Sequence, residues 1–168
     1  MPKATVPPID SGRLRLRLLE EADLDMTLRW RNQDHIRIWF KTSDIIPPEQ
    51  HRAWFERYRH RDDDFVFIIE ERLAQWKPVG QVSLYNIDWR SRTAEFGRLM
   101  IGESCARGKG IGKEAVQVLI NFSFYVLGIE KIELEVLCEN KPAFRLYESC
   151  GFVRKSSERN LIVMELVK

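Results

Sequence analysis

The chain has 168 residues, 44% of them hydrophobic, and a formal net charge of +2 at pH 7. This length is typical of a single domain over residues 1–168, with enough apolar residues to build a core without disulfides or a structural metal. The small charge gives no indication of nucleic-acid binding. The sequence has no apolar run of about 18 residues that would span a membrane, and no signal-peptide pattern at its start. We therefore expect a cytoplasmic protein.

Metal and disulfide chemistry are not indicated. The three cysteines, Cys105, Cys138 and Cys150, are widely spaced, and no histidine lies at ligand spacing from them. This pattern predicts neither a disulfide framework nor a zinc site.

Hydrophobic periodicity predicts eleven elements. In chain order they are a strand over 13–19, helices over 21–31 and 48–59, strands over 65–70 and 80–88 joined by a hairpin at 73–78, a strand over 93–101, a helix over 112–127, a strand over 131–138, a helix over 142–150, and strands over 152–155 and 161–167. This order indicates a three-layer α/β fold, with a mixed central sheet flanked by helices on both faces.

One segment between a predicted strand and a predicted helix is rich in glycine and basic residues. It reads Arg107, Gly108, Lys109, Gly110, Ile111, Gly112 and Lys113. Glycines allow a backbone to pass close to a ligand, and the start of the next helix offers free N–H groups and a partial positive charge. The segment therefore predicts a pyrophosphate site.

Two common phosphate loops do not fit these letters. A Walker A loop requires a glycine where Arg107 stands and a Ser or Thr where Glu114 stands. A dinucleotide-binding loop requires a third glycine at the position of Lys113. The pattern that does fit is Arg/Gln-x-x-Gly-x-Gly, although an ordinary glycine-rich turn before a helix remains the alternative.

A second motif lies downstream of this loop. It is Asn-x-x-Ala-x-x-x-Tyr-x-x-x-Gly-Phe, formed by Asn140, Ala143, Tyr147, Gly151 and Phe152. With the glycine loop, it resembles the GCN5-related N-acetyltransferases (GNAT family) over residues 93–152. The alternative is an ordinary helix that is capped by Asn140 and ended by Gly151.

The resemblance implies acetyl-CoA as cosubstrate, with its pyrophosphate on residues 107–113. It further implies that the backbone of Leu99, Met100 and Ile101 binds the pantetheine arm and that Asn140 faces the cofactor. Tyr147 is then the general acid that protonates the departing thiolate, or else a packed tyrosine without a catalytic role. Glu95 is the expected general base, because a charged residue on a central strand often faces a wet cleft; many family members have no single base.

The first third of the chain is expected to select the acceptor amine. Seven basic residues lie between positions 13 and 41: Arg13, Arg15, Arg17, Arg29, Arg31, Arg37 and Lys41. The expected acceptor-binding residues are Trp30, Arg31, Asn32, Arg37, Trp39 and His51. This constellation resembles the branch that acetylates nucleotide-linked 4-amino-4,6-dideoxy sugars in pseudaminic acid synthesis. Arginines and tryptophans suit a diphosphate and a sugar face, although the aromatic residues have an alternative interpretation as core.

Three other functions remain open. Aminoglycoside 6'-acetyltransferases share some of these letters but bind polycations, which basic surroundings disfavour. Ribosomal-protein N-terminal acetyltransferases share the layout and the strand glutamate. A non-catalytic acyl-CoA sensor is the third alternative. We expect a monomer or homodimer that binds a small-molecule amine, with no nucleic-acid or membrane partner.

Overall fold

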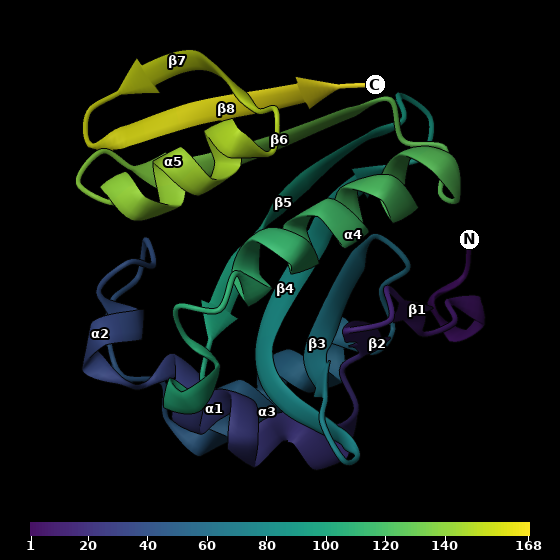
Figure 1. The fold of residues 1–168 in the computed structure, drawn as a ribbon, viewed down its shortest axis with the longest axis vertical. Coiled ribbons are helices and arrows are strands. Elements are labelled where there is room, and N and C mark those ends of the chain that lie inside the picture. Colours follow the sequence, from purple (N-terminus) through teal and green to yellow (C-terminus); the bar gives the residue numbers. More distant parts are fainter.

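The computed structural model describes residues 1–168 and arranges eight strands in one mixed sheet (Figure 1). The strands are β1 (Ile9–Asp10), β2 (Leu14–Leu18), β3 (Asp64–Arg72), β4 (Trp76–Asp88), β5 (Thr93–Ile101), β6 (Lys131–Leu137), β7 (Val153–Glu158) and β8 (Leu161–Val167). Their order in the sheet is β1-β2-β3-β4-β5-β6-β8-β7. Every neighbouring pair is antiparallel except β5 and β6, which are parallel.

Five α-helices accompany the sheet. They are α1 (Leu24–Arg31), α2 (Asp34–Arg37), α3 (Pro48–Tyr58), α4 (Ile111–Tyr125) and α5 (Lys141–Ser149). Helices α4 and α5 cover one face of the sheet, and α1 and α3 cover the other (Figure 1). This arrangement confirms the predicted three-layer α/β fold. None of the helices combines the length and apolar character needed to cross a bilayer.

Alternation along the strands divides the core between the two faces. In β3, Phe65, Phe67 and Ile69 belong to the large cluster under α4, while Val66 and Ile68 belong to the smaller cluster under α1 and α3. Because successive strand side chains point to opposite faces, this continuous apolar run is buried on both sides.

The parallel ladder between β5 and β6 is short, and the space beyond its end is where a site can form. Strand β5 pairs with β6 only from Thr93 to Phe96, opposite Lys131 to Leu134. Beyond Phe96, β5 contains a bulge at which Arg98 takes a positive φ of 53°. The two strands therefore diverge, and the backbone of the second half of β5 is free of β6.

Several boundaries differ from the sequence prediction. The predicted helix over 21–31 begins as a 3-10 turn, Glu21–Asp23, and becomes α-helical at Leu24. The turn is fixed by a reciprocal capping box in which the side chains of Glu20 and Asp23 bond each other's backbone N–H groups. Helix α2 and strand β1 were not predicted, because each is too short to show a hydrophobic period.

Candidate functional site

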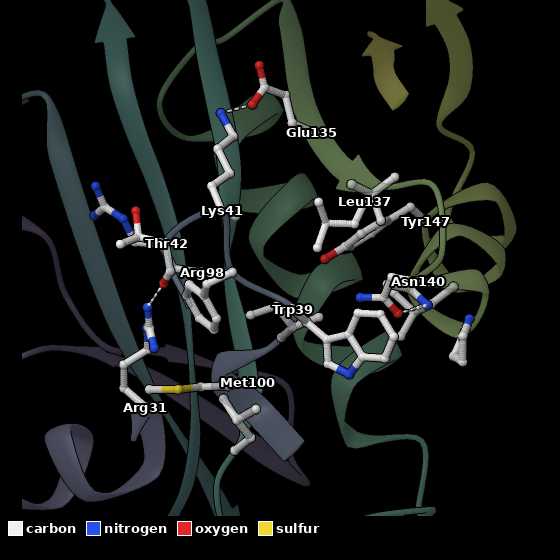
Figure 2. A pocket seen from close by; sticks show the side chains of 18 of the residues that line it. Arg31, Trp39, Lys41, Thr42, Arg98, Met100, Glu135, Leu137, Asn140 and Tyr147 are labelled. Carbon is white, nitrogen blue, oxygen red and sulfur yellow. Dashed lines mark hydrogen bonds and ion pairs between the residues drawn. The ribbon is translucent and has the colours of Figure 1, made fainter. Parts of the chain in front are cut away.

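A cavity of about 590 Å³ opens where β5 and β6 diverge. We call it the main cavity. Its walls come from the second half of β5, from β6, from α5, and from the segment that runs through α2 (Figure 2). Residues from both halves of the chain thus face one space, as the resemblance implied.

Tyr147 projects from α5 into the main cavity. Its ring packs edge-on against Phe96 and Phe152, at centroid distances of 5.8 and 6.1 Å. Figure 2 shows its hydroxyl directed toward the middle of the cavity. Burial raises the pKa of this hydroxyl well above its usual value, so the group is protonated at physiological pH. It is therefore a neutral donor facing the cavity.

Glu95 lies outside the main cavity. The Glu95 carboxylate accepts a hydrogen bond from Asn86 Nδ2 at 3.0 Å. In the β4–β5 ladder, Glu95 is the cross-strand partner of Tyr85. Tyr85 itself lines the cavity. Burial, and secondarily the Glu95 charge, raise the pKa of the Tyr85 hydroxyl. A proton could therefore pass from the cavity to Glu95 only through Tyr85 or water.

The glycine loop lies beside α5, one wall of the main cavity, but does not itself line that cavity. Gly108 and Gly110 have positive φ of 72° and 75°, and a Cβ at either would meet nothing within 4 Å. The 15-residue helix α4 begins at Ile111, directly after Gly110 as N-cap. A Cβ at Gly112 would lie 3.6 Å from Leu146, which lines the main cavity. Open space over left-handed glycines at a helix start fits a pyrophosphate.

The other residues predicted to bind the cofactor lie at the main cavity or on the glycine loop and the first turn of α4. Leu99 and Met100 line the main cavity, and the Ile101 carbonyl accepts a 3.4 Å hydrogen bond from Arg107 Nε. Lys109 is exposed on the loop, and Lys113 is exposed in the first turn of α4.

Asn140 also lines the main cavity, and its Oδ1 accepts a hydrogen bond from Ala143 N at 3.3 Å. Its role as helix N-cap is thus confirmed, and its role toward the cofactor stays a prediction.

Three of the six expected acceptor residues have structural partners instead. Trp30 is fully buried, its Nε1 donates to Glu103 Oε1 at 2.8 Å, and its ring lies against Gly102. Asn32 exchanges two 2.9 Å hydrogen bonds with the backbone of Ile46. The expectation that Trp30 contacts the acceptor is therefore wrong, because its ring is core, and Asn32 instead holds the loop before α3.

Arg37 is the third of these residues. Its guanidinium pairs with Asp34 at 2.9 Å and donates to the Ser43 carbonyl at 2.7 Å. It does not line the main cavity. Its hydrogen bonds instead hold the segment after α2 in a turn.

Arg31 and Trp39 do line the main cavity (Figure 2). Trp39 is 41% exposed. Arg31 is 8% exposed, lies with its Cζ 4.2 Å from the Phe40 ring centre, and donates from Nη2 to the Thr42 carbonyl. Its other terminal nitrogen, Nη1, is buried without a partner. Burial, and then the neighbouring Arg37, lower the pKa of this guanidinium.

His51 lines a second cavity, of about 270 Å³, between α1, α3 and the β4–β5 bulge. Its Nε2 lies 3.2 Å from Thr27 Oγ1, and its ring stacks on Trp54 at 5.4 Å. Burial lowers the pKa of the imidazole, so His51 is neutral at physiological pH. We call this space the rear cavity.

Two features of the main cavity were missed by the sequence analysis. Arg98 lines both cavities while donating to Asp64 Oδ1 at 2.8 Å. Glu135 of β6 forms an ion pair with Lys41, which joins the loop after α2 to β6 (Figure 2). No group of three or more His, Cys, Asp or Glu side chains is arranged to hold a metal ion.

Known proteins resemble this chain over most of its length. Residues 13–153 match the family described as Acetyltransferase (GNAT) domain. Spermidine N(1)-acetyltransferase of Vibrio cholerae is 30% identical over 145 residues, which cover 86% of this chain and 82% of that protein. Human alpha/beta-tubulin-N-acetyltransferase 9 is 34% identical over 120 residues, which cover 66% of this chain and 58% of that protein.

A solved structure resembles the fold as a whole. The crystal structure of spermidine N-acetyltransferase from Vibrio cholerae in complex with CoA and spermine has a TM-score of 0.83 at 27% identity. The match covers 94% of this chain and 96% of that chain. None of these relatives is an amino-sugar enzyme by name, so they do not support the branch expected from the sequence.

Proposed function

The chain belongs to the GNAT acetyltransferase family and uses acetyl-CoA to acetylate amines, and we propose that its acceptor is a small primary amine that also carries an anionic group. The observation that carries this proposal is the charge of the main cavity. Arg31, Lys41 and Arg98 line it, and the one carboxylate among its lining residues, Glu135, is paired with Lys41.

Charge complementarity favours an anionic acceptor. A cleft lined by one sign of charge concentrates ligands of the opposite sign and repels those of the same sign. A polyamine would bring several positive charges to a wall that already holds the Arg31 guanidinium, which has no carboxylate partner. A nucleotide-linked 4-amino-4,6-dideoxy sugar, such as a UDP-4-amino-4,6-dideoxy-N-acetyl-altrosamine, brings two phosphates and a single amine. It therefore remains the first acceptor to test.

The side chains of the main cavity suit acetyl transfer. Acetyl-CoA supplies the acetyl group as a thioester. Tyr147 keeps its hydroxyl proton because it is buried, and donates that proton to the departing sulfur. The backbone of Leu99 and Met100, free of β6, orients the chain that carries the acetyl group. Glu95 takes the ammonium proton through Tyr85 or water.

A polyamine is the second candidate, and the relatives favour it. The Vibrio cholerae relative is a spermidine N(1)-acetyltransferase, and a related structure contains spermine. The human relative is named for tubulin, which shows that the acceptor differs among similar chains. N-terminal peptides, aminoglycosides and a non-catalytic acyl-CoA sensor remain as further alternatives.

The test is thiol release from acetyl-CoA with a panel of acceptors. The panel contains a UDP-linked 4-amino sugar, spermidine, an N-terminal peptide and an aminoglycoside, each with product mass determined. We expect the highest kcat/KM for the anionic sugar nucleotide. Efficient acetylation of spermidine with an inert sugar nucleotide would refute the proposed acceptor and establish the polyamine. Binding of acetyl-CoA without acetylation of any amine would favour the sensor.

A further inference from the structure

The rear cavity adjoins the main cavity through a shared wall. Four residues line both spaces: Arg31, Phe40, Arg98 and Met100. The rear cavity lies on the α1 and α3 side of the sheet, behind the β5 bulge. The two cavities are therefore adjacent, and an acceptor that occupied both would lie across the side chains of these four residues.

The charge of the rear cavity is entirely positive. Three arginines, Arg31, Arg57 and Arg98, line it, and none of its eleven lining residues is Asp or Glu. Arg57, on the exposed side of α3, forms no hydrogen bond or ion pair with another side chain. The neutral lining residues Gln50 and Gln81 add amide donors.

Arg31 provides the second, independent observation. Its guanidinium is charged at any physiological pH, is 8% exposed, and has no carboxylate partner. Nη1 is buried with no hydrogen-bond acceptor at all. A buried donor without a partner costs about 1–3 kcal/mol, and more when it is charged. Because Arg31 lines the rear cavity, an oxyanion bound there would lie next to this guanidinium and offset its charge.

Contacts with Asp64 and Tyr85 also fix the Arg98 side chain in the wall of the rear cavity. Its positive φ of 53° is an uncommon conformation for a residue with a side chain. Asp64 holds one of its terminal nitrogens at 2.8 Å, and the Tyr85 ring lies 4.2 Å from its Cζ. The guanidinium is thus fixed at the boundary between the two cavities, with further N–H donors available.

We propose that the rear cavity binds the carboxylate or phosphate group of the acceptor, through Arg31, Arg57 and Arg98, while the acceptor amine lies in the main cavity. This inference rests on the proposed function, because it assigns the anionic end of the same acceptor. Guanidinium groups bind such oxyanions with two parallel, charge-assisted hydrogen bonds. The aromatic ring of Trp54 forms an adjoining wall for the part of the acceptor next to that group.

The first experiment measures anion binding directly. Protein saturated with coenzyme A, so that the loop at residues 107–113 is occupied, is titrated calorimetrically with inorganic phosphate and with acetate. We expect Arg57→Ala to weaken phosphate binding about tenfold or more. Arg52→Ala is the matched control, because Arg52 is an exposed arginine on the same helix that lines neither cavity. Equal phosphate affinity in the two variants would overturn the proposal.

Arg31→Met separates a ligand role from a structural role. Replacing a buried charge that has no carboxylate partner by an apolar side chain of similar length removes the cost of burying that charge. We expect the melting temperature of Arg31→Met to be at least that of the wild type, with phosphate binding lost. A lower melting temperature with unchanged phosphate affinity would show a structural role and contradict the proposal.

The second experiment uses acetyl transfer. O-Phosphoethanolamine and ethanolamine differ in one phosphate, and the ratio of their kcat/KM values measures the preference for the anionic group. Arg57→Ala should lower this ratio about tenfold or more, and Arg52→Ala should keep it. An unchanged ratio in Arg57→Ala would refute the rear cavity as the anion site. Phosphate binding that depends on Arg57, in a protein that acetylates no amine, would instead refute the proposed function and leave the anion site.

Discussion

Burial shifts the pKa values of two polar side chains of the main cavity in opposite directions. The Tyr147 hydroxyl is kept protonated, because the low-polarity surroundings raise its pKa. The Arg31 guanidinium has its pKa lowered by burial, yet guanidinium groups remain charged throughout the physiological range. One cavity is thus lined by both a neutral proton donor and a cation without a carboxylate partner. This combination suits a reaction in which the departing thiolate takes up a proton and the acceptor carries a negative charge.

The first prediction concerns Tyr147. Tyr147→Phe keeps the ring that packs on Phe96 and Phe152 but removes the proton donor. Turnover should fall about 10²-fold, while the dissociation constant of acetyl-CoA changes little. Steady-state kinetics and calorimetry measure the two quantities. A wild-type turnover number in Tyr147→Phe would show that water or another group protonates the sulfur.

The second prediction concerns Glu95, whose cross-strand neighbour Tyr85 lines the main cavity. Glu95→Gln keeps the shape and the contact with Asn86 but removes a basic carboxylate. If Glu95 accepts the proton through Tyr85, the acidic limb of the kcat/KM profile should flatten or shift. Tyr85→Phe should then change the same limb. Profiles that superimpose on the wild type in both variants would exclude this route.

At the scale of elements, the packing of α1 against the end of β5 positions the segment through α2 that lines the main cavity. Gly102 follows β5, and a Cβ there would lie 2.0 Å from the Trp30 ring. The ring cannot move aside, because it is fully buried and its Nε1 is bonded to Glu103. Trp30 therefore connects α1 to the strand that forms one wall of the cavity.

This contact gives the third prediction. Gly102→Ala overpacks the Trp30 contact and should destabilise the protein by about 1–3 kcal/mol. For a chain of this size, each kcal/mol lowers the melting temperature by about 2–4 °C. Gly112→Ala, measured without cofactor, is the control, because its Cβ would make an ordinary 3.6 Å contact with Leu146. Equal melting temperatures for the two variants would contradict the argument.

Sequence reasoning succeeded where the signal is local. Hydrophobic periods predicted most strands and helices, and the two motifs predicted the glycine loop before α4 and the helix α5 that lines the main cavity. Its errors concern Trp30 and the residues it missed, Arg98 and Glu135. The local sequence around an aromatic residue between arginines is the same whether that residue packs in the core or contacts a ligand. The Arg98 bulge and the Glu135–Lys41 pair arise from contacts between distant segments, which no local pattern contains.

At the scale of the whole molecule, a short parallel ladder joins two parts of the sheet. Strands β1 to β5 form one part, and β6, β8 and β7 form the other. Only the pairing from Thr93 to Phe96 with β6 connects them within the sheet, and the main cavity opens beyond it. Coenzyme A bound along the divergence would contact both parts, whereas the unfolded chain would not bind it.

The last prediction follows from this architecture. A ligand that binds only the folded state at 100 times its dissociation constant adds about 2.7 kcal/mol of stability. For a domain of this size, coenzyme A should then raise the melting temperature by about 5–11 °C. Gly110→Val should lose most of this shift at the same concentration, because its side chain would fill the open space over a loop that must approach the pyrophosphate. Differential scanning calorimetry of both proteins, with and without coenzyme A, measures the shift. Because the positive φ of Gly110 also strains the valine variant itself, its cofactor-free melting temperature is the baseline. A wild-type shift above that baseline would remove the glycine loop from the cofactor site.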